Sequence, residues 1–356
     1  MGKRNNHLII MAGGIGSRFW PMSTEQKPKQ FIDVMGVGKS LLQLTVERFK
    51  GIIDDDNVWI VTNERYRDIV AEQLPQLPAG NILLEPCRRN TAPCIAYVSW
   101  RIKKRDPKAN IVVTPSDHIV LNGEEFRRVV SQCLDFTEKS DAIVTLGMKP
   151  TRPETGYGYI QADLSANTLS CKEIFRVDSF REKPDRETAE QYVAKNYYFW
   201  NAGIFIWNVN TIVNAFRIYQ PRISKIFEQL LPVLDTDKEQ EAINEWFPQC
   251  ESISVDYAIM EKAEEIFVCP ADFGWSDLGT WGSLQEQSHR DIYGNATIGN
   301  NVDLYECHNC IVHTTQEQRV VLQGLDGYIV AEHDGTLLVC SLKEEQRIRQ
   351  FAENAK

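Results

Sequence analysis

Short apolar runs alternate with longer amphipathic stretches along most of this chain. The runs are brief and rich in β-branched residues, and turn-forming residues end each of them, which is typical of buried strands. We therefore predict strands in the segments HLIIMA (7–12), NVWIVTN (57–63), NIVVTPSD (110–117) and AIVTLGM (142–148).

Helical patterns lie between these predicted strands. The segment SLLQLTVERFK is opened by Ser40 and the segment TAPCIAYVSWRIKKRD by Thr91, and both residue types commonly cap a helix. Alternating strands and helices predict an α/β fold, in which helices cover both faces of a mainly parallel sheet. On such a sheet, ligands bind beyond the carboxyl ends of the strands.

The pattern changes after about Gln285. From there the chain consists of predicted short strands separated by Gly, Asn and Asp turns, and its first part resembles the rungs of a short parallel β-helix. A helix of mixed charge, LKEEQRIRQFAENAK, closes the chain. We therefore expect a large α/β domain over 1–287 and a small C-terminal β-helical domain with a terminal helix over 288–356.

Composition and charge narrow the function classes. The chain has 356 residues, 43% of them hydrophobic, and a net charge of −10, so it has ample material for a core in two domains. We expect no nucleic-acid partner, because binding to phosphate backbones needs a clustered basic surface. The apolar run from Leu8 to Ala12 is too short for a membrane span or a signal sequence, so we expect no membrane association.

The cysteines indicate a cytoplasmic protein with reduced thiols. There are nine, an odd number, and most stand in apolar surroundings. The segment Cys307-His308-Asn309-Cys310 is similar to a zinc or redox motif, but no second ligand pair stands at a suitable spacing. Buried, inward-facing thiols are therefore the favoured interpretation.

A glycine-rich segment after the first predicted strand indicates anion binding. Gly13, Gly14 and Gly16 allow backbone N–H groups to approach an anion without obstruction by Cβ atoms, and Ala12 precedes them. Arg18 supplies a planar fork for phosphate oxygens, and we expect Lys29 to act as a mobile point charge. A dinucleotide fingerprint fails at Phe19 and a P-loop fails at Asp33, where each pattern needs glycine.

This segment, AGGIGSRFWPMSTEQKPKQF, resembles the signature of the sugar-nucleotide pyrophosphorylases, and most closely of those that make GDP-mannose. The resemblance continues, in the order of the family, through EPCRRNTAPCIA, VVTPSDHIV, TGYGYI, FREKPD, FWNAGIF, SVDYAIMEK and GWSDLGTW. It implies a Rossmann-like nucleotidyltransferase domain with a mainly parallel, mixed sheet and, in the short form that lacks a fused isomerase domain, a small C-terminal β-helical domain. It also implies a homodimer or a higher homo-oligomer.

The activity that this resemblance implies is transfer of GMP from GTP to α-D-mannose 1-phosphate, giving GDP-mannose and pyrophosphate. The attacking phosphate is already an anion, so the reaction needs in-line positioning and charge screening rather than a general base. Arg18 and Lys29 supply part of the screening, and Mg²⁺ would supply the rest. By resemblance, Asp117 and Asp277 match the metal-binding aspartates of the family.

Other motifs of the resemblance carry the expected substrate contacts. The nucleotide-binding residues are Ala12, Gly13, Gly14, Gly16, Glu85, Asn90, Thr91, Ser116 and Asp117, and Glu85 is the expected acceptor for the guanine N–H groups. The residues expected to bind the sugar phosphate are Gly156, Tyr157, Gly158, Glu182, Lys183, Asn201 and Gly203. Asp256 and Tyr257 are weaker candidates, since an ordinary capped helix also explains their segment.

Two alternatives stay open from the sequence. One is a sibling pyrophosphorylase that uses another base or another sugar 1-phosphate, and the other is a catalytically silent sugar-nucleotide sensor. The joint presence of Arg18, Lys29, Asp117 and Asp277 argues against the silent protein. The segment after Ser288 shows no cluster of catalytic residue types, so we expect it to serve assembly and stability rather than chemistry.

Overall fold

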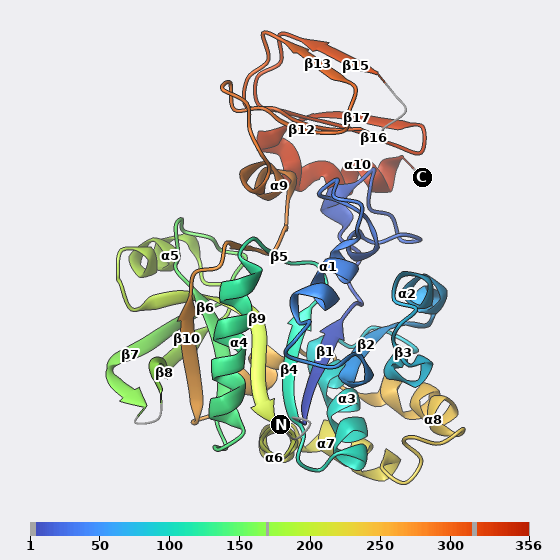
Figure 1. Cartoon of the computed structure of the whole chain (residues 1–356), viewed down its shortest axis with the longest axis vertical. Coiled ribbons are helices and arrows are strands. Elements are labelled where there is room, and N and C mark those ends of the chain that lie inside the picture. The colour runs from blue at the N-terminus through green and yellow to red at the C-terminus, as the bar shows by residue number, and fades with distance from the viewer. Residues whose placement is uncertain (1–4, 169–170, 315–318, 356) are drawn as a thin grey trace. The chain divides into compact units, whose positions relative to one another are not determined.

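The computed structural model describes residues 5–168, 171–314 and 319–355 (Figure 1). Its residues form two compact units that alternate along the chain. The sheet unit consists of Met1–Gly13, Arg48–Pro115 and Val120–Trp275, and the loop unit consists of Gly14–Glu47, Ser116–Ile119 and Ser276–Lys356. The expected division into 1–287 and 288–356 stays a prediction, because these units follow contacts rather than one cut in the sequence.

The sheet unit contains a nine-stranded sheet with the order β3-β2-β1-β4-β9-β6-β10-β8-β7. Its strands are β1 (Asn6–Met11), β2 (Val58–Asn63), β3 (Ile82–Glu85), β4 (Asn110–Pro115), β6 (Ile143–Met148), β7 (Tyr159–Thr168), β8 (Cys171–Arg181), β9 (Tyr198–Asn208) and β10 (Ile266–Ala271). All four strands predicted from apolar runs are confirmed, as β1, β2, β4 and β6.

The sheet is mixed, as predicted, but parallel pairs do not predominate among its described strands. Strands β3, β2, β1 and β4 are parallel, with Leu8 opposite both Val58 and Val112. Strand β9 is antiparallel to its neighbours β4 and β6, and β7 pairs antiparallel with β8. Strand β8 is antiparallel to β7 because it follows β7 directly, whereas a parallel neighbour would need a crossover connection of a dozen or more residues.

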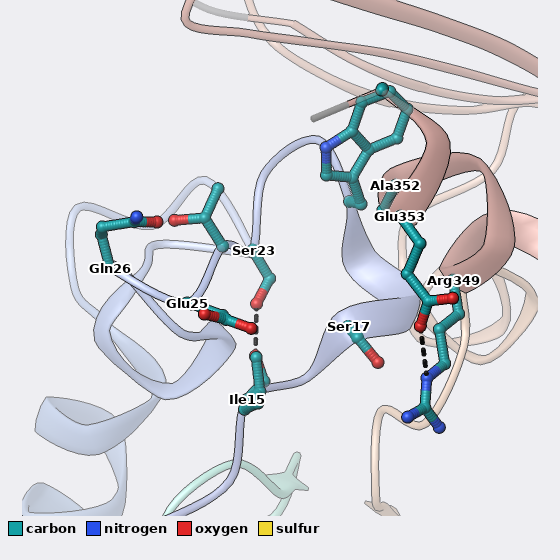
Figure 2. Close-up of a pocket in the computed structure, with 11 residues that line it drawn as sticks. Ile15, Ser17, Ser23, Glu25, Gln26, Arg349, Ala352 and Glu353 are labelled. Carbon is teal, nitrogen blue, oxygen red and sulfur yellow. Dashed lines mark hydrogen bonds and ion pairs between the residues drawn. The ribbon is translucent and has the colours of Figure 1, made fainter.

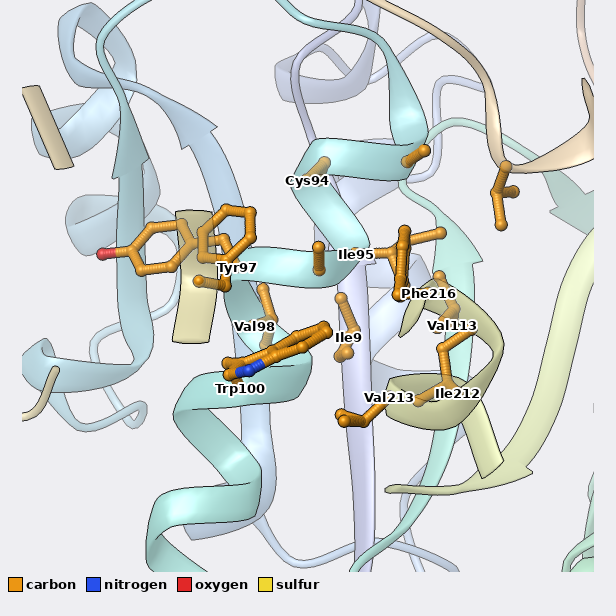
Figure 3. Close-up of a cluster of buried hydrophobic side chains, with 14 of the residues drawn as sticks. Ile9, Cys94, Ile95, Tyr97, Val98, Trp100, Val113, Ile212, Val213 and Phe216 are labelled. Carbon is orange, nitrogen blue, oxygen red and sulfur yellow. The ribbon is translucent and has the colours of Figure 1, made fainter. Parts of the chain in front are cut away.

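Helices of the sheet unit bury its largest core. They are α2 (Arg67–Gln73), α3 (Thr91–Arg105), α4 (Gly123–Thr137), α5 (Arg186–Val193), α6 (Val209–Tyr219), α7 (Pro221–Leu230) and α8 (Glu239–Trp246). Figure 3 shows Ile95 and Trp100 of α3 beside Ile9 of β1 and Phe216 of α6, and all four are at most 1% exposed. Burial of each such side chain contributes about 1.5–3 kcal/mol. This core therefore fixes the strands whose carboxyl ends carry the candidate site.

The two predicted helix starts differ in outcome. Ser40 caps α1 (Leu41–Arg48) as predicted: its Oγ accepts from the Gln43 amide at 3.2 Å, and the Gln43 side chain accepts from the Ser40 amide at 2.9 Å. The predicted cap of α3 is wrong by one residue, because the Asn90 side chain accepts from the Thr91 amide. The Thr91 hydroxyl instead accepts from the amide of Val255 at 2.8 Å.

The C-terminal part of the loop unit contains the predicted short strands. Its strands are β12 (Ala296–Ile298), β13 (Val302–Tyr305), β14 (Ile311–His313), β15 (Val320–Gln323), β16 (Tyr328–His333) and β17 (Thr336–Ser341). Strands β12, β14 and β16 pair in parallel, β13 pairs in parallel with β15, and β17 is antiparallel to β16. The predicted closing helix is a 3₁₀ segment (Leu342–Arg347) followed by α10 (Ile348–Asn354).

Two short strands and one helix lie outside these groups. Strands β5 (Ile119–Val120) and β11 (Trp275–Ser276) pair with each other, and α9 (Trp281–Gln287) begins with a Thr280 capping box. None of the helices in the described part of the chain combines the length and the apolar character that crossing a membrane would need.

The thiols of Cys307 and Cys310, suspected as metal ligands, are buried and donate to backbone carbonyls of Tyr305 and His308.

The loop unit has a hydrophobic core that joins the two ends of the chain. Phe19 and Met22 of the glycine-rich segment lie in one cluster with Trp281, Ile329 and Ile348, which are all at most 2% exposed. The segment after Ser288 therefore supports the fold of the segment that carries Arg18 and Lys29.

This shared core predicts that a distant substitution disturbs the glycine-rich segment. Ile348→Ala should lower the free energy of unfolding by about 2–5 kcal/mol, because it leaves a cavity beside packed residues. Leu337→Ala is a matched control, since Leu337 is 62% exposed and its loss should cost within about 0.5 kcal/mol. Urea unfolding measures both, and equal stability of the two variants would contradict the shared core.

Candidate active site

The glycine-rich segment follows β1 and is held by contacts within the loop unit. The Gln30 side chain donates to the Gly14 carbonyl at 2.9 Å, and the Ser23 hydroxyl donates to the Ile15 carbonyl at 2.6 Å. Gly16 has a φ of 65°, and a Cβ atom there would lie 2.6 Å from the Cβ of Lys29. Glycine at position 16 is therefore required both by the backbone conformation and by the close approach of Lys29.

The ammonium group of Lys29 is fixed, which corrects the expectation of a mobile point charge. Lys29 is 4% exposed, and its Nζ lies 3.0 Å from the Asp117 Oδ2. It also donates to the backbone carbonyls of Asp277 at 3.1 Å and Leu278 at 2.7 Å. An ammonium group has three donors, so each proton of Lys29 has an acceptor inside the protein.

One pocket of the loop unit brings together four residues that the sequence singled out. Arg18, Lys29, Asp117 and Asp277 all line it. Burial acts to raise the pKa of Asp117, but the charges of Lys29 and His118 outweigh it and hold that pKa below its usual value. Asp117 is therefore an anion at neutral pH. The Asp277 Oδ1 accepts from the Gly279 amide at 3.0 Å, which orients its carboxylate.

The donor set of this pocket fits a hard divalent cation. Mg²⁺ is usually bound by one or two carboxylates, with water and substrate phosphates completing its octahedron. Asp117 and Asp277 supply two carboxylates in one pocket. Within the described ranges, no group of three or more His, Cys, Asp or Glu side chains is arranged to hold a metal. Asp117 and Asp277 are therefore the candidate protein ligands of such a site.

Glu85 lies at the carboxyl end of β3, in the sheet unit. It is 7% exposed, and its Oε1 is buried without a hydrogen-bond partner among the described residues. Burial raises the pKa of Glu85 to about 8, despite a hydrogen bond from Cys94 and the charge of Arg88. A Cβ atom on Gly13 would lie 3.8 Å from the Glu85 Oε2. Two predicted nucleotide residues are thus neighbours here.

Other predicted nucleotide residues have structural partners. The Ala12 amide donates to the Val61 carbonyl at 2.8 Å, so it is committed to the sheet. Asn90 caps α3, and the Thr91 hydroxyl accepts from Val255, which uses one acceptor of each side chain. Ser116, in the loop unit, is 3% exposed, and its carbonyl accepts from Thr45.

The predicted sugar residues form a polar cluster in the sheet unit. The side-chain amide of Asn201 donates to the Asp256 Oδ1 at 3.0 Å, and its backbone N–H donates to the Gly158 carbonyl at 2.8 Å. A Cβ atom on Gly158 would lie 2.6 Å from the Glu182 Oε2, so glycine makes room for that carboxylate. Glu182 also pairs with Lys183 at 2.7 Å. The structure therefore gathers Gly158, Glu182, Lys183 and Asn201.

The remaining sugar candidates surround this cluster. The Gly203 amide donates to the Asn201 Oδ1 at 3.1 Å, and the Gly156 amide donates to Glu154 at 3.0 Å. The ring of Tyr157 packs edge-on against Trp200, with centroids 5.2 Å apart. Asp256 opens a π-helical turn (Asp256–Met260), and such turns are frequent at functional sites.

Sequence reasoning missed several residues that line the Lys29 pocket. Ser17, Phe19, His118 and Gly279 stand beside predicted residues in the same motifs, whereas Gln346 and Arg349 come from a segment without any predicted site residue. Both belong to the closing helical segment, in which charged residues alternate without a local motif. The pattern indicated only a solvated helix, because tertiary packing decides which of its side chains meet the glycine-rich segment.

Comparison with known proteins agrees with this fold and these motifs. A family model described as nucleotidyl transferase matches residues 7–292. The chain therefore belongs to the nucleotidyl transferase family, and the mixed sheet described above is the fold of that family.

Curated relatives narrow the resemblance. A mannose-1-phosphate guanylyltransferase from Salmonella montevideo is 38% identical over 354 residues, covering 98% of this chain and 73% of that protein. Another from Escherichia coli (strain K12) is 35% identical, covering 100% of this chain and 74% of that protein. A crystal structure from Thermus thermophilus, described as a mannose-1-phosphate geranyltransferase, has a TM-score of 0.88 at 28% identity and covers 99% of both chains. The family resemblance predicted from the motifs is confirmed.

The carboxylates of the sugar cluster predict a stability that depends on pH. Burial, with the nearby Glu182 charge, raises the pKa of Asp256 to about 6. A carboxyl whose pKa is higher in the folded state stabilises the fold below its unfolded pKa, and this stability is lost as the pH rises through about 6. Asp256→Asn should therefore raise the free energy of unfolding at pH 8 by about 1–3 kcal/mol, with little difference near pH 4.

Urea unfolding of the wild type and of Asp256→Asn at both pH values measures this effect. Asp237→Asn is a matched control, because Asp237 is exposed and its replacement should show no such pH dependence. A gain in stability that is the same at both pH values would contradict the raised pKa.

Proposed function

We propose that this protein transfers GMP from GTP to α-D-mannose 1-phosphate, with GDP-mannose and pyrophosphate as products. The names of its curated relatives support the reaction, and the grouping of Arg18, Lys29, Asp117 and Asp277 in one pocket is consistent with it. The phosphate of the sugar is already an anion and attacks the α-phosphorus of GTP, so the chain must position the two reactants and screen their charge.

The observation that carries the choice of base is the orphaned carboxylate oxygen of Glu85. Guanine presents two adjacent donors, N1–H and N2–H, and an ionised carboxylate accepts from both in one plane. Adenine presents no such pair of donors, and uracil presents a single donor between two acceptors. A buried oxygen without a partner favours a ligand that supplies the missing donor, since leaving it unpaired costs about 1–3 kcal/mol.

In this proposal, residues of the loop unit neutralise the charges of the phosphate groups. Arg18 binds phosphate oxygens, and the amides of the glycine-rich segment face the same anion. Asp117 and Asp277 would hold Mg²⁺, which when bound neutralises phosphate charge near the reacting phosphorus. Lys29 fixes the Asp117 carboxylate and the backbone beside Asp277, so its role includes positioning both metal ligands.

The sugar cluster supplies specificity in this proposal. Glu182, Asn201 and Asp256 offer acceptors and donors to the hydroxyl groups of the sugar, and a site built from hydrogen bonds rejects epimers that leave these groups unpaired. Lys183 is 58% exposed and pairs with Glu182, so its ammonium can reach the phosphate of the sugar.

Three finer features belong to the same proposal. The parallel pairings of β12, β14 and β16, and of β13 with β15, support rungs of a small β-helix.

We also infer a cytoplasmic location, since every cysteine that the structure describes as free is buried apart from Cys87, which suits thiols that stay reduced. The family resemblance supports a homodimer or a higher homo-oligomer, and gel filtration with light scattering measures that state.

The Glu85 assignment predicts a change in base selectivity. Glu85→Gln replaces two acceptors by one acceptor and one donor, which opposes the guanine N2–H group. The ratio of kcat/KM for GTP to that for UTP should fall by about 10–100-fold. Pyrophosphate release across a matrix of nucleoside triphosphates and sugar 1-phosphates measures this ratio.

The same assignment predicts a proton linkage. With a pKa of about 8, Glu85 carries a proton at pH 7, and pairing with guanine favours its ionised form. GTP binding should therefore release a proton at pH 7, and GTP affinity should rise with pH until about 8. Calorimetry in buffers of different ionisation enthalpy detects the proton in the wild type, and its persistence in Glu85→Gln would rule out this role.

The metal assignment predicts that the two aspartates act together. Asp117→Asn and Asp277→Asn should each lose most activity and raise the Mg²⁺ concentration needed for half-maximal rate. The double variant should be little worse than either single one, because both remove the same ion. Asp303→Asn is the control, since Asp303 of β13 pairs with Arg319, which precedes β15, and lies outside the Lys29 pocket. An unchanged Mg²⁺ midpoint in both single variants would exclude the shared site.

A further inference from the structure

The C-terminal helical segment reaches the pocket that contains Lys29. Arg349 of α10 and Gln346, just before it, line this pocket together with Arg18, Asp117 and Asp277. Arg349 also lines an adjoining pocket of the loop unit, which Ile15 and Ser17 line as well (Figure 2). Its place on both walls puts this guanidinium beside the glycine-rich segment.

The charges of the Lys29 pocket leave little positive charge for a ligand. Lys29 is matched by Asp117 and two carbonyls, and Asp277 adds a second carboxylate. The carboxylates of Asp117 and Asp277 would also neutralise most of the charge of a cation bound to them. Arg18 and Arg349 are then the arginines of this pocket that face the several negative charges of a triphosphate.

Arg349 is held loosely enough to change partners. Its Nε lies 3.6 Å from the Glu353 Oε1, one turn further along α10, and the two side chains are 71% and 65% exposed. Figure 2 shows this pair as a dashed line. An exposed i,i+4 pair contributes only about 0.3–0.5 kcal/mol. A phosphate accepts two parallel hydrogen bonds from a guanidinium and competes well against such a pair.

We propose that Arg349 binds the polyphosphate chain of the nucleotide, so that the C-terminal helix supplies a substrate-binding residue to the reaction. This inference rests on the proposed function, because it takes the Lys29 pocket as the triphosphate site. It revises the expectation that the segment after Ser288 serves only assembly and stability. Arg349 then contacts GTP in the forward reaction and pyrophosphate in the reverse reaction.

The test is steady-state kinetics of Arg349→Ala in both directions. The KM for GTP and the KM for pyrophosphate should each rise by about 5–30-fold, as expected for loss of a charge-assisted hydrogen bond. The KM for mannose 1-phosphate and the midpoint of thermal unfolding should stay within the error of the wild type. Arg349→Lys should fall between the two, since it keeps the charge but loses the fork.

Lys343→Ala is the matched control, because it removes one positive charge from the same helical segment outside the pocket. It should leave every KM unchanged. Equal effects of Lys343→Ala and Arg349→Ala would overturn the inference, as would an unchanged KM for GTP in a folded Arg349→Ala enzyme. Wild-type protein that releases no pyrophosphate from GTP and mannose 1-phosphate would instead contradict the proposed function itself.

Discussion

The buried ammonium group of Lys29 is the interaction on which the candidate site depends. It joins three separate parts of the chain, because its acceptors belong to Asp117 and to the Asp277–Leu278 turn. A buried cation is tolerated only when its hydrogen bonds are satisfied, and removal of one partner commonly costs about 3–5 kcal/mol. The positive charge therefore fixes the carboxylate of Asp117 and the backbone that presents Asp277, and it does so from the inside of the loop unit.

Both polar and apolar contacts of the loop unit hold the residues around Lys29 in place. The polar contacts of Lys29 define where the carboxylates lie, whereas the cluster that includes Phe19, Trp281 and Ile348 buries the segment that carries Lys29. A hydrogen bond to a charged group gains strength as water is excluded. The hydrophobic cluster and the polar pocket thus depend on each other, and neither would hold its geometry alone.

The sequence predicts those features that depend on neighbouring residues. Strands β1, β2, β4 and β6 were predictable because each is a local apolar run. The Ser40 cap was predictable because its hydrogen-bond partner, Gln43, lies within the same helical turn. The cap of α3 was not, since a partner 164 positions away, Val255, occupies the Thr91 hydroxyl. The direction of β9 is likewise set by its two neighbours in the sheet rather than by its own residues.

In the candidate site, too, the sequence identified some residues, whereas other features depend on tertiary packing. Family motifs identified the residues of the Lys29 pocket and of the sugar cluster, but they did not show that Lys29 is saturated by acceptors. Arg349 lacked any signal of its own, because packing of Ile348 in the loop-unit core decides where its guanidinium lies.

The alternation of the two units along the chain has a consequence for synthesis on the ribosome. The glycine-rich segment leaves the ribosome early, yet Lys29 finds its carbonyl acceptor 249 residues later, and the core under the loop is completed only by α10. Contacts of such long sequence separation form slowly, since a long loop must close before they stabilise anything. The sheet unit has most of its strands before residue 210, so it can begin to fold while the glycine-rich segment still lacks its partners. Synthesis of α10, rather than emergence of the glycine-rich segment itself, thus sets the earliest moment at which the core under this segment can be completed.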